Sequence, residues 1–404
     1  MISRREGSEE RAPSGVPSSD AVDRAQGIAE TLRAAAERIE EARALPLDVV
    51  SALHDARLFR LLLPRSIGGD EVHLKVLAEV METVARADAS TAWCLGQAAG
   101  CAMSAAYLTP DVARRLFGPA NAVLAWGAGI QGKAIAVDGG YRVTGKWTFA
   151  SGCANATLLG GHSYVFEADG SPRIGADGRQ LDRTALFPVS KARIHDMWHT
   201  IGLRGTASYT YEVEDLFVPE EETIDRDKSE ERNESGTLFL FPTTIAYAVA
   251  FSALMLGIAQ GMVSDLAALA LTKTPRGRPS SLVESQVFQS EYAQLEARLR
   301  SARTFLHTTI EESWDKARVS RDVPLIERAN IKLASTYAIN QGVEIAADAY
   351  RAAGQTAIFP VNPFERRLRD AYSASQQLQG RPANFITIGR VLLGLPPDSP
   401  VVLG

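Results

Sequence analysis

Residues 126–152 are the part of this chain whose residue types and spacing best suit cofactor chemistry, and they read WGAGIQGKAIAVDGGYRVTGKWTFASG. Gly127, Gly129 and Gly132 have the spacing G-x-G-x-x-G. In a dinucleotide-binding unit, glycines at this spacing close a strand and open a helix that faces a pyrophosphate. Here alternating residues follow instead, around the tight-turn sequence Asp-Gly-Gly at 138–140. We therefore predict two strands joined by a hairpin, and no dinucleotide site.

The other reactive side chains form no familiar catalytic or metal-binding set. His195 and His199 flank Trp198 without a cysteine or carboxylate cluster to complete a metal site, and His162 is the histidine that could reach a pocket. No H-E-x-x-H, G-x-S-x-G or Walker sequence is present. We predict no metal site, and neither hydrolase nor kinase activity has support.

The composition is that of an ordinary globular protein. The 404 residues carry a net charge of -5 and are 46% hydrophobic, which gives no reason to expect nucleic acid or an anionic membrane as a partner. Cys94, Cys101 and Cys153 lack metal spacing and indicate a reducing, cytoplasmic setting without disulfides. No run of residues matches the membrane-helix pattern, and residues 1–20 resemble a disordered lead-in.

The periodicity of apolar residues divides the chain into three structured parts. It follows a helical period over 21–120, a period of two with turn signals over 121–222, and a helical period again over 235–396. We predict an α+β protein with an N-terminal helical domain, a central antiparallel, β-barrel-like domain and a C-terminal four-helix bundle. The expected helices are 25–39, 47–56, 74–86, one containing Trp93, 245–272, 281–310, 323–353 and 366–378.

That order of domains, with these sequences, resembles the acyl-CoA dehydrogenase superfamily, and most closely its branch of two-component flavin-dependent monooxygenases, the group D oxygenase components. The segments that carry the resemblance are 58–69, 85–93, 139–152, 202–208, 213–219 and 364–377. The resemblance implies the fold of that family, and a flavin bound between the β-domain and the C-terminal helices.

Carboxylate positions separate the dehydrogenase interpretation from the monooxygenase one. A dehydrogenase acting on acyl thioesters needs a carboxylate base to remove an α-proton. In the families that the chain resembles, this base lies after the Arg-Asp pair of the C-terminal helix, or on an earlier helix where we align Tyr247. Residues 375–384 contain no Asp or Glu, and Phe149 stands where a threonine near the flavin is usual. These absences favour the monooxygenase.

The resemblance implies specific flavin contacts. Ser151 corresponds to a serine near flavin N5, and Gln377 stands where the family often has a histidine, so we expect these two as catalytic residues. Trp147 and Phe149 are two apart on a strand and could share a flavin-facing surface, the alternative being sheet core. The full set of expected cofactor contacts is Trp93, Trp126, Gly127, Ala128, Trp147, Phe149, Ala150, Ser151, Arg276, Gly354, Gln355, Gln377 and Leu378.

The function implied by the resemblance is that of an oxygenase component. Reduced FMN or FAD from a separate NAD(P)H-dependent flavin reductase would react with O2 to give a C4a-(hydro)peroxide that oxygenates a small organic substrate. The resemblance also implies a homotetramer. Two alternatives stay open: an acyl-CoA dehydrogenase with a non-standard base, and a catalytically silent flavin-binding protein.

Overall fold

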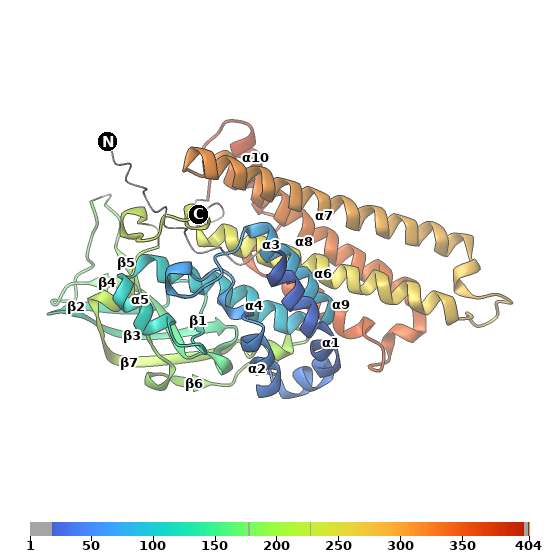
Figure 1. Cartoon of the computed structure of the whole chain (residues 1–404), viewed down its shortest axis with the longest axis horizontal. Helices are drawn as coiled ribbons and strands as arrows, with labels where there is room; N and C mark the ends of the chain where they lie inside the picture. The colour runs from blue at the N-terminus through green and yellow to red at the C-terminus, as the bar shows by residue number, and fades with distance from the viewer. Residues whose placement is uncertain (1–17, 177, 227, 400–402, 404) are drawn as a thin grey trace, which may run out of the picture.

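The computed structural model describes residues 18–176, 178–226, 228–399 and 403 (Figure 1). The predicted disordered lead-in therefore lies outside the described residues up to residue 17. The helical first part consists of α1 (Ser18–Ala42), α2 (Leu47–Asp55), α3 (Leu74–Ala87), α4 (Ala89–Ala102) and α5 (Pro110–Phe117). Asp88 begins α4, because its carboxylate accepts a hydrogen bond from the backbone N–H of Thr91 at 2.6 Å. The helices predicted from periodicity in this part are confirmed.

The central part is one sheet of eight strands, β1 (Leu124–Trp126), β2 (Gly132–Val137), β3 (Gly140–Ala150), β4 (Leu158–Phe166), β5 (Asp182–Pro188), β6 (Arg193–His195), β7 (Tyr209–Pro219) and β8 (Thr223–Ile224). The predicted hairpin is confirmed: β2 begins at Gly132 where a nucleotide-binding helix would begin, and Gly139 takes a positive φ of 73° in the turn. The strand order is β6-β7-β3-β2-β4-β5-β8, with β1 paired to β4.

The expectation of a purely antiparallel sheet is wrong, because β4 pairs in parallel with both β1 and β2. The chain reverses after β2 into β3 and reverses again before β4, which then lies on the other side of β2. Two reversals restore the original direction, so β4 runs parallel to β2. The turn signals show where strands end, but not which strand becomes a neighbour.

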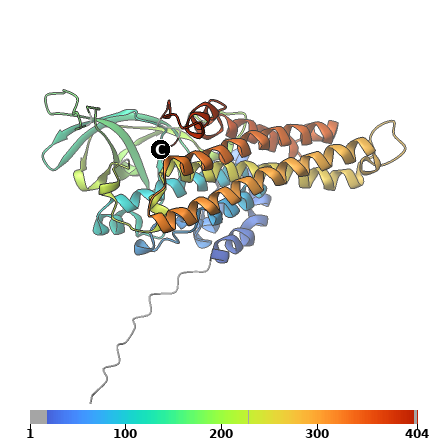
Figure 2. The ribbon, with the colours of Figure 1, turned by 90° about the horizontal axis from the view of Figure 1, so that it is seen from above.

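The C-terminal part consists of α6 (Thr243–Thr272), α7 (Gln286–Ser320), α8 (Leu325–Ala353), α9 (Phe364–Ser375) and α10 (Asn384–Leu392). The periodicity anticipated the first four of these and missed the short α10. Long helices lie side by side and extend away from the sheet (Figures 1 and 2). In α6, a Cβ on Gly257 would lie 2.5 Å from the carbonyl oxygen of Glu82, so the missing side chain lets α3 and α6 pack closely.

Helix α6 is long and apolar enough to cross a membrane by length and composition, so the expectation that no run has this pattern is wrong. Within its most apolar window, however, 61% of the helix is buried inside the protein. It packs between α3 and α8 and supplies more buried residues than any neighbouring element to the main core. Helix α6 is therefore the central helix of the folded core, and its apolar side chains are buried there.

Candidate active site

The end of strand β3 departs from regular strand geometry next to Ser151. The pairing of β3 with β7 shifts register between Trp147 and Ala150, and Phe149 takes a positive φ of 62°. A non-glycine residue in this region is strained, and such strain is often found at functional sites. The bulge turns Phe149 outward, where 62% of its surface is exposed and its ring meets the edge of Trp198.

The hydroxyl of Ser151 lies in a chain of hydrogen bonds that joins three parts of the fold. The indole N–H of Trp93, on α4, donates to Ser151 Oγ at 2.9 Å. Ser151 Oγ lies 2.7 Å from Ser208 Oγ, which in turn lies 2.7 Å from Thr206 Oγ1. Thr206 Oγ1 lies 2.9 Å from the carbonyl oxygen of Leu203.

The two ends of this hydroxyl chain fix the direction of every proton in it. A carbonyl oxygen only accepts, so Thr206 donates to Leu203 and must accept from Ser208. Ser208 then accepts from Ser151, whose single proton is used. Because the hydroxyl of Ser151 also accepts from Trp93, it keeps one lone pair for a further donor. Ser151 is therefore arranged as an acceptor of hydrogen bonds.

The loop from Leu203 to Ser208 is held rigidly on three sides. The carboxylate of Asp370, on α9, accepts from the backbone N–H of Leu203 at 2.6 Å. The backbone N–H of Gly205 donates to Ser90 Oγ at 3.2 Å, and that of Gly152 donates to the carbonyl oxygen of Thr206 at 2.8 Å. Leu203 and Ala207 both have positive φ values, of 50° and 43°. Contacts from α4, α9 and β3 thus maintain a strained loop.

Burial, opposed by the hydrogen bond from the backbone N–H of Leu203 and assisted by the charge of Asp88, raises the pKa of Asp370 to about 7. Asp370 is 5% exposed. The segment 364–377, which carries part of the family resemblance, contains Asp370, but the sequence suggested no role for this residue. Its spacing in the Arg-Asp pair carries no signal of a contact 167 residues away in the chain.

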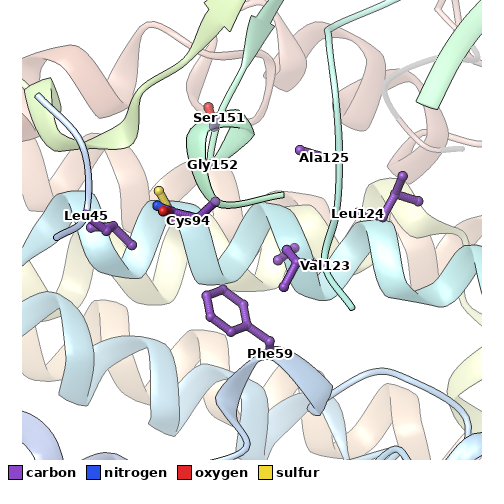
Figure 3. Close-up of a pocket in the computed structure, with 10 residues that line it drawn as sticks. Leu45, Phe59, Cys94, Val123, Leu124, Ala125, Ser151 and Gly152 are labelled. Atoms are coloured by element: carbon purple, nitrogen blue, oxygen red, sulfur yellow. The ribbon is translucent and has the colours of Figure 1, made fainter. Parts of the chain in front are cut away.

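A small cavity of about 10 Å³ adjoins Ser151 and Gly152 (Figure 3). Its walls are mostly apolar and include Phe59, Cys94 and Val123. This volume is about that of one water molecule. The Ser151 hydroxyl points away from the cavity in Figure 3, so the side of the strand end that carries the hydroxyl chain is separate from it.

The segment Trp126-Gly127-Ala128 lies directly against β3, next to the strand whose end carries Ser151. A Cβ on Gly127 would lie 2.6 Å from the carbonyl oxygen of Thr148, which explains the glycine. The N–H of Gly127 donates to the hydroxyl of Tyr211 at 3.2 Å, and the N–H of Ala128 donates to Thr148 at 3.1 Å. Both donors are thus used within the protein.

The expectation that Trp147 and Phe149 share one face is wrong, because the bulge between Trp147 and Ala150 interrupts the alternation of side chains. Trp147 is fully buried, stacks on Tyr211 and donates its indole N–H to the carbonyl oxygen of His162 at 2.9 Å. Ala150 is also fully buried in this cluster. Their side chains offer no surface to a flavin, so both are core residues of the sheet domain.

Gln377 and Leu378 lie beyond the end of α9, which stops at Ser375 rather than continuing to residue 378 as expected. The side-chain oxygen of Gln377 accepts from the backbone N–H of Gln379 at 2.8 Å and starts a 3-10 turn, Leu378–Gly380. Its side-chain nitrogen is buried without a hydrogen-bond partner among the described residues. This nitrogen is a donor without an acceptor.

The structure brings the segments carrying Arg276, Gly354 and Gln355 together at the tip of the helical bundle. The ammonium of Lys273 donates to the carbonyl oxygen of Ala353, which joins the α6–α7 loop to the end of α8. Arg276 is exposed in that loop. In Figure 1 this tip and the β-strands lie at opposite ends of the molecule. One chain therefore does not place these three residues beside Ser151.

Two further residues of the site, Thr206 and Ser208, were missed by sequence reasoning although both lie in the quoted segment 202–208. Their roles depend on a loop conformation with positive φ at Leu203 and Ala207, which nothing in the residue types signals. Among the described residues, no group of three or more His, Cys, Asp or Glu side chains could hold a metal ion. His162 is buried against Thr184, with its Nδ1 2.6 Å from Thr184 Oγ1.

Comparison with known proteins adds to this geometry. The model of the acyl-CoA dehydrogenase N-terminal domain matches residues 22–120, and that of the acyl-CoA dehydrogenase C-terminal domain matches residues 249–379. Together they span more than half of the chain. They cover the N-terminal helices, including α4 with Trp93, and the C-terminal helices from most of α6 to α9.

Individual relatives are named as oxygenases. An indole-3-acetate monooxygenase of Pseudomonas putida is 29% identical over 90% of this chain and 91% of its own. The oxygenase component of an FADH2-dependent resorcinol hydroxylase of Rhizobium sp. is 34% identical over 50% of this chain and 48% of its own. The structure of XiaF from Streptomyces sp., in complex with FADH2 and glycerol, superimposes with a TM-score of 0.87 at 23% identity, over 95% of this chain and 97% of that one. The chain belongs to the acyl-CoA dehydrogenase family, among relatives that are flavin-dependent monooxygenase oxygenase components.

Proposed function

We propose that this chain is the oxygenase component of a two-component flavin-dependent monooxygenase. The observation that carries the proposal is the hydroxyl chain that leaves Ser151 as an acceptor beside the outward-facing Phe149. The names of relatives that align along nine-tenths of the chain support the same activity. The proposed substrate is a small organic molecule, with O2 as co-substrate.

The residues present fit a reduced flavin. Reduced flavin carries a proton on N5, and the spare lone pair of Ser151 suits such a donor. The unpartnered side-chain nitrogen of Gln377 suits a flavin or substrate oxygen. When bound, reduced FMN or FAD supplies the activation of O2. Phe149, Trp93 and the segment 126–128 are the proposed side walls. These assignments of Ser151 and Gln377 as catalytic residues are proposals.

The same residues keep water from Ser151. Ser151 is 7% exposed as a whole residue, and Ser208 and Thr206 behind it are buried. Oxygen chemistry on a flavin is productive only where water is excluded, so a closed chain of protein hydroxyls suits this role better than a solvated one.

The α6–α7 loop that carries Arg276 lies at the tip of the helical bundle (Figure 1), whereas Ser151 lies where the end of β3 meets α4, so a flavin held by both residues needs a second copy of the chain. Large apolar side chains are exposed near both of these places. Met197 and Ile201 are 66% and 69% exposed in the loop before Leu203, and Phe359 and Val361 are 55% and 89% exposed after Gln355. Contact between the first surface of one copy and the second surface of a neighbouring copy would cover these side chains. We therefore propose a homotetramer with shared flavin sites.

The dehydrogenase alternative lacks a suitable base at the aligned positions. Burial raises the pKa of the Tyr247 hydroxyl well above its ordinary value, so it is neutral and a poor base. Asp370 is already bonded to the backbone of Leu203. An α-proton would therefore need a carboxylate from elsewhere.

The proposed partner is a separate NAD(P)H-dependent flavin reductase, since the G-x-G-x-x-G sequence forms a strand rather than a nucleotide-binding turn. A cytoplasmic location is part of the proposal, and the three buried cysteines are free thiols.

The test is an anaerobic titration with reduced and oxidised FMN and FAD. An oxygenase component is expected to bind a reduced form more tightly than the oxidised form. Rapid bleaching of bound oxidised flavin by an acyl-CoA would instead establish the dehydrogenase, and failure to bind any flavin form would establish the silent protein.

A further inference from the structure

A lysine is completely buried in helix α8, where it forms no ion pair with the described residues. Lys332 is 0% exposed, and burial lowers its pKa to about 7. Its Nζ donates to the side-chain oxygen of Gln379, in the turn Leu378–Gly380 that follows α9. Burying an amine costs hydration free energy, and a methionine of similar size would fill the same space without that cost. Packing alone therefore does not explain a lysine at this position.

Lys332 belongs to a polar stripe on α8 that holds this turn. Residues 332, 336 and 340 are spaced by four, so they lie on one face of the helix. The hydroxyl of Thr336 donates to the carbonyl oxygen of Gln379 at 3.1 Å. The side-chain nitrogen of Asn340 donates to the carbonyl oxygen of Gly380 at 3.1 Å. A Cβ on Gly380 would lie 2.8 Å from a side chain of α8, so the turn lies directly against a long, rigid helix.

The turn fixes which way the side-chain amide of Gln377 faces. The backbone N–H of Gln379 only donates, so the Gln377 atom that it meets at 2.8 Å is the side-chain oxygen. An ammonium also only donates, so Lys332 fixes the side-chain oxygen of Gln379 in the same way. The amide nitrogen of Gln377 therefore points away from the Gln379 N–H.

That nitrogen is buried and has no acceptor among the described residues. Buried donors are normally satisfied, so an unpaired one indicates a partner that is not part of the protein chain. A chain of contacts thus runs from Lys332 through the side chain and backbone of Gln379 to the amide of Gln377, and ends in a donor that is available to a bound molecule.

We propose that Lys332 is a positioning residue for the flavin site, which through Gln379 holds Gln377 with its amide nitrogen as a donor to the reduced flavin ring. This role rests on the proposed function. Reduced flavin has more electron density on its ring oxygens and nitrogens than oxidised flavin, so a fixed donor favours the reduced form. A loosely held amide could turn either its oxygen or its nitrogen toward the ring and would lose this preference. Lys332 thus contributes to the selection of reduced flavin without touching it.

The experiment measures the dissociation constants of oxidised and reduced FMN and FAD under anaerobic conditions. Their ratio sets the reduction potential of the bound flavin. The variants are Lys332→Met, Gln379→Met, these two combined, Gln377→Leu, and Gln377→Leu combined with either of the first two. The control is Ser313→Ala, which removes a different buried hydrogen bond to α8, the one of 3.0 Å from Ser313 to the carboxylate of Glu327. Thermal melts of all variants accompany the titrations.

We expect Lys332→Met to reduce the preference for reduced flavin by about threefold to tenfold, which corresponds to one lost hydrogen bond. Gln379→Met should do the same, and neither change should add to the loss caused by Gln377→Leu, because all three act through one amide. The Lys332→Met/Gln379→Met double variant leaves neither partner unpaired, so it should recover Tm but not the preference. Ser313→Ala should keep the preference.

Three results would overturn the role of Lys332 while the wild type still prefers reduced flavin. They are an unchanged preference in Lys332→Met, a loss that adds to that of Gln377→Leu, and a preference that returns together with Tm in the Lys332→Met/Gln379→Met variant. If Lys332→Met does not fold, Gln379→Met carries the same test. A wild type that binds no flavin, or that prefers oxidised flavin, rejects the proposed function and this role with it.

Discussion

The indole nitrogen of Trp93 lies 2.9 Å from the hydroxyl oxygen of Ser151, and its hydrogen bond joins helix α4 to the end of strand β3. Trp93 can only donate, so this bond uses one lone pair of Ser151 and leaves its proton for Ser208. The pair therefore sets the direction of a hydroxyl chain that ends at the carbonyl oxygen of Leu203.

Replacing Ser151 tests its role as an acceptor. We expect Ser151→Ala to weaken binding of reduced flavin by about threefold to tenfold, the usual value of one lost hydrogen bond, with little change for oxidised flavin. The fraction of O2 released as H2O2 should rise. Fluorescence titration under anaerobic conditions measures the first effect and a peroxide assay the second.

The matched control is Ser163→Ala, which removes another buried hydroxyl, one bonded to the carbonyl oxygen of Gly161 inside the sheet. The Ser163→Ala variant should still bind reduced flavin more tightly than oxidised flavin. Equal losses in both variants would show that the effect comes from destabilised β-structure rather than from the Ser151 hydroxyl.

Ser208→Ala tests whether the hydroxyl chain fixes the orientation of Ser151. Without Ser208 as acceptor, the Ser151 proton can turn toward the flavin and donate to unprotonated N5. Ser208→Ala should therefore narrow the difference in affinity between reduced and oxidised flavin. The two sites touch, so a double-mutant cycle should give a coupling of about 0.5–3 kcal/mol. If the effects of Ser151→Ala and Ser208→Ala on the ratio of reduced-flavin to oxidised-flavin affinity are additive in the double variant, Ser208 does not act through Ser151.

Phe149→Gly should separate stability from function. Glycine accepts the positive φ of 62° at this position without strain, which favours the folded state by roughly 1 kcal/mol. The exposed ring loses only its edge contact with Trp198. We expect Tm to stay level or rise while flavin affinity falls. Phe217→Ala, at an exposed ring on β7, is the comparison, and it should leave flavin affinity intact.

The raised pKa of Asp370 gives a pH dependence with a defined sign. In the folded state it holds a proton up to about pH 7, whereas in the unfolded chain it releases this proton near pH 3.8. The folded state thus binds more protons in this interval, so the contribution of Asp370 to stability falls as pH rises from about 4 to 7. Asp370→Asn removes this pH-dependent contribution to the free energy of unfolding. The amide oxygen of the new side chain can still accept the hydrogen bond from Leu203.

We therefore expect the Tm of Asp370→Asn, relative to wild type, to increase between about pH 5 and pH 8 in thermal melts. His73, whose pKa burial lowers to about 4, contributes with the opposite sign and cancels in this comparison because both proteins contain it. A Tm difference that is constant with pH would contradict the raised pKa.

The fold was largely predictable from the sequence, because its helices are amphipathic or uniformly apolar over several turns. The limits of α3 and α6 follow from such periods within two residues. Parallel pairing of β4 was not predictable, because strand order depends on contacts between distant segments. Helix α10 was missed although it is as long as α2, which the periodicity did predict.

The candidate site was only partly predictable. Ser151 was identified through its motif, and it remains a prediction with physical support from its hydrogen bonds. Trp147 could not be separated from Phe149, because a bulge of one residue reverses the side of the sheet. The partners Ser208 and Asp370 act through a loop that only the three-dimensional structure brings together.

The central claim is that this chain inserts oxygen from O2 into an organic substrate. The direct measurement supplies wild-type protein with reduced FMN or FAD from a flavin reductase, 18O2 and a panel of aromatic acids with their neutral counterparts, and analyses the products by mass spectrometry. We predict one 18O atom in a product. No labelled organic product across the panel, together with anaerobic bleaching of the oxidised flavin by an acyl-CoA, would contradict the claim and establish a dehydrogenase.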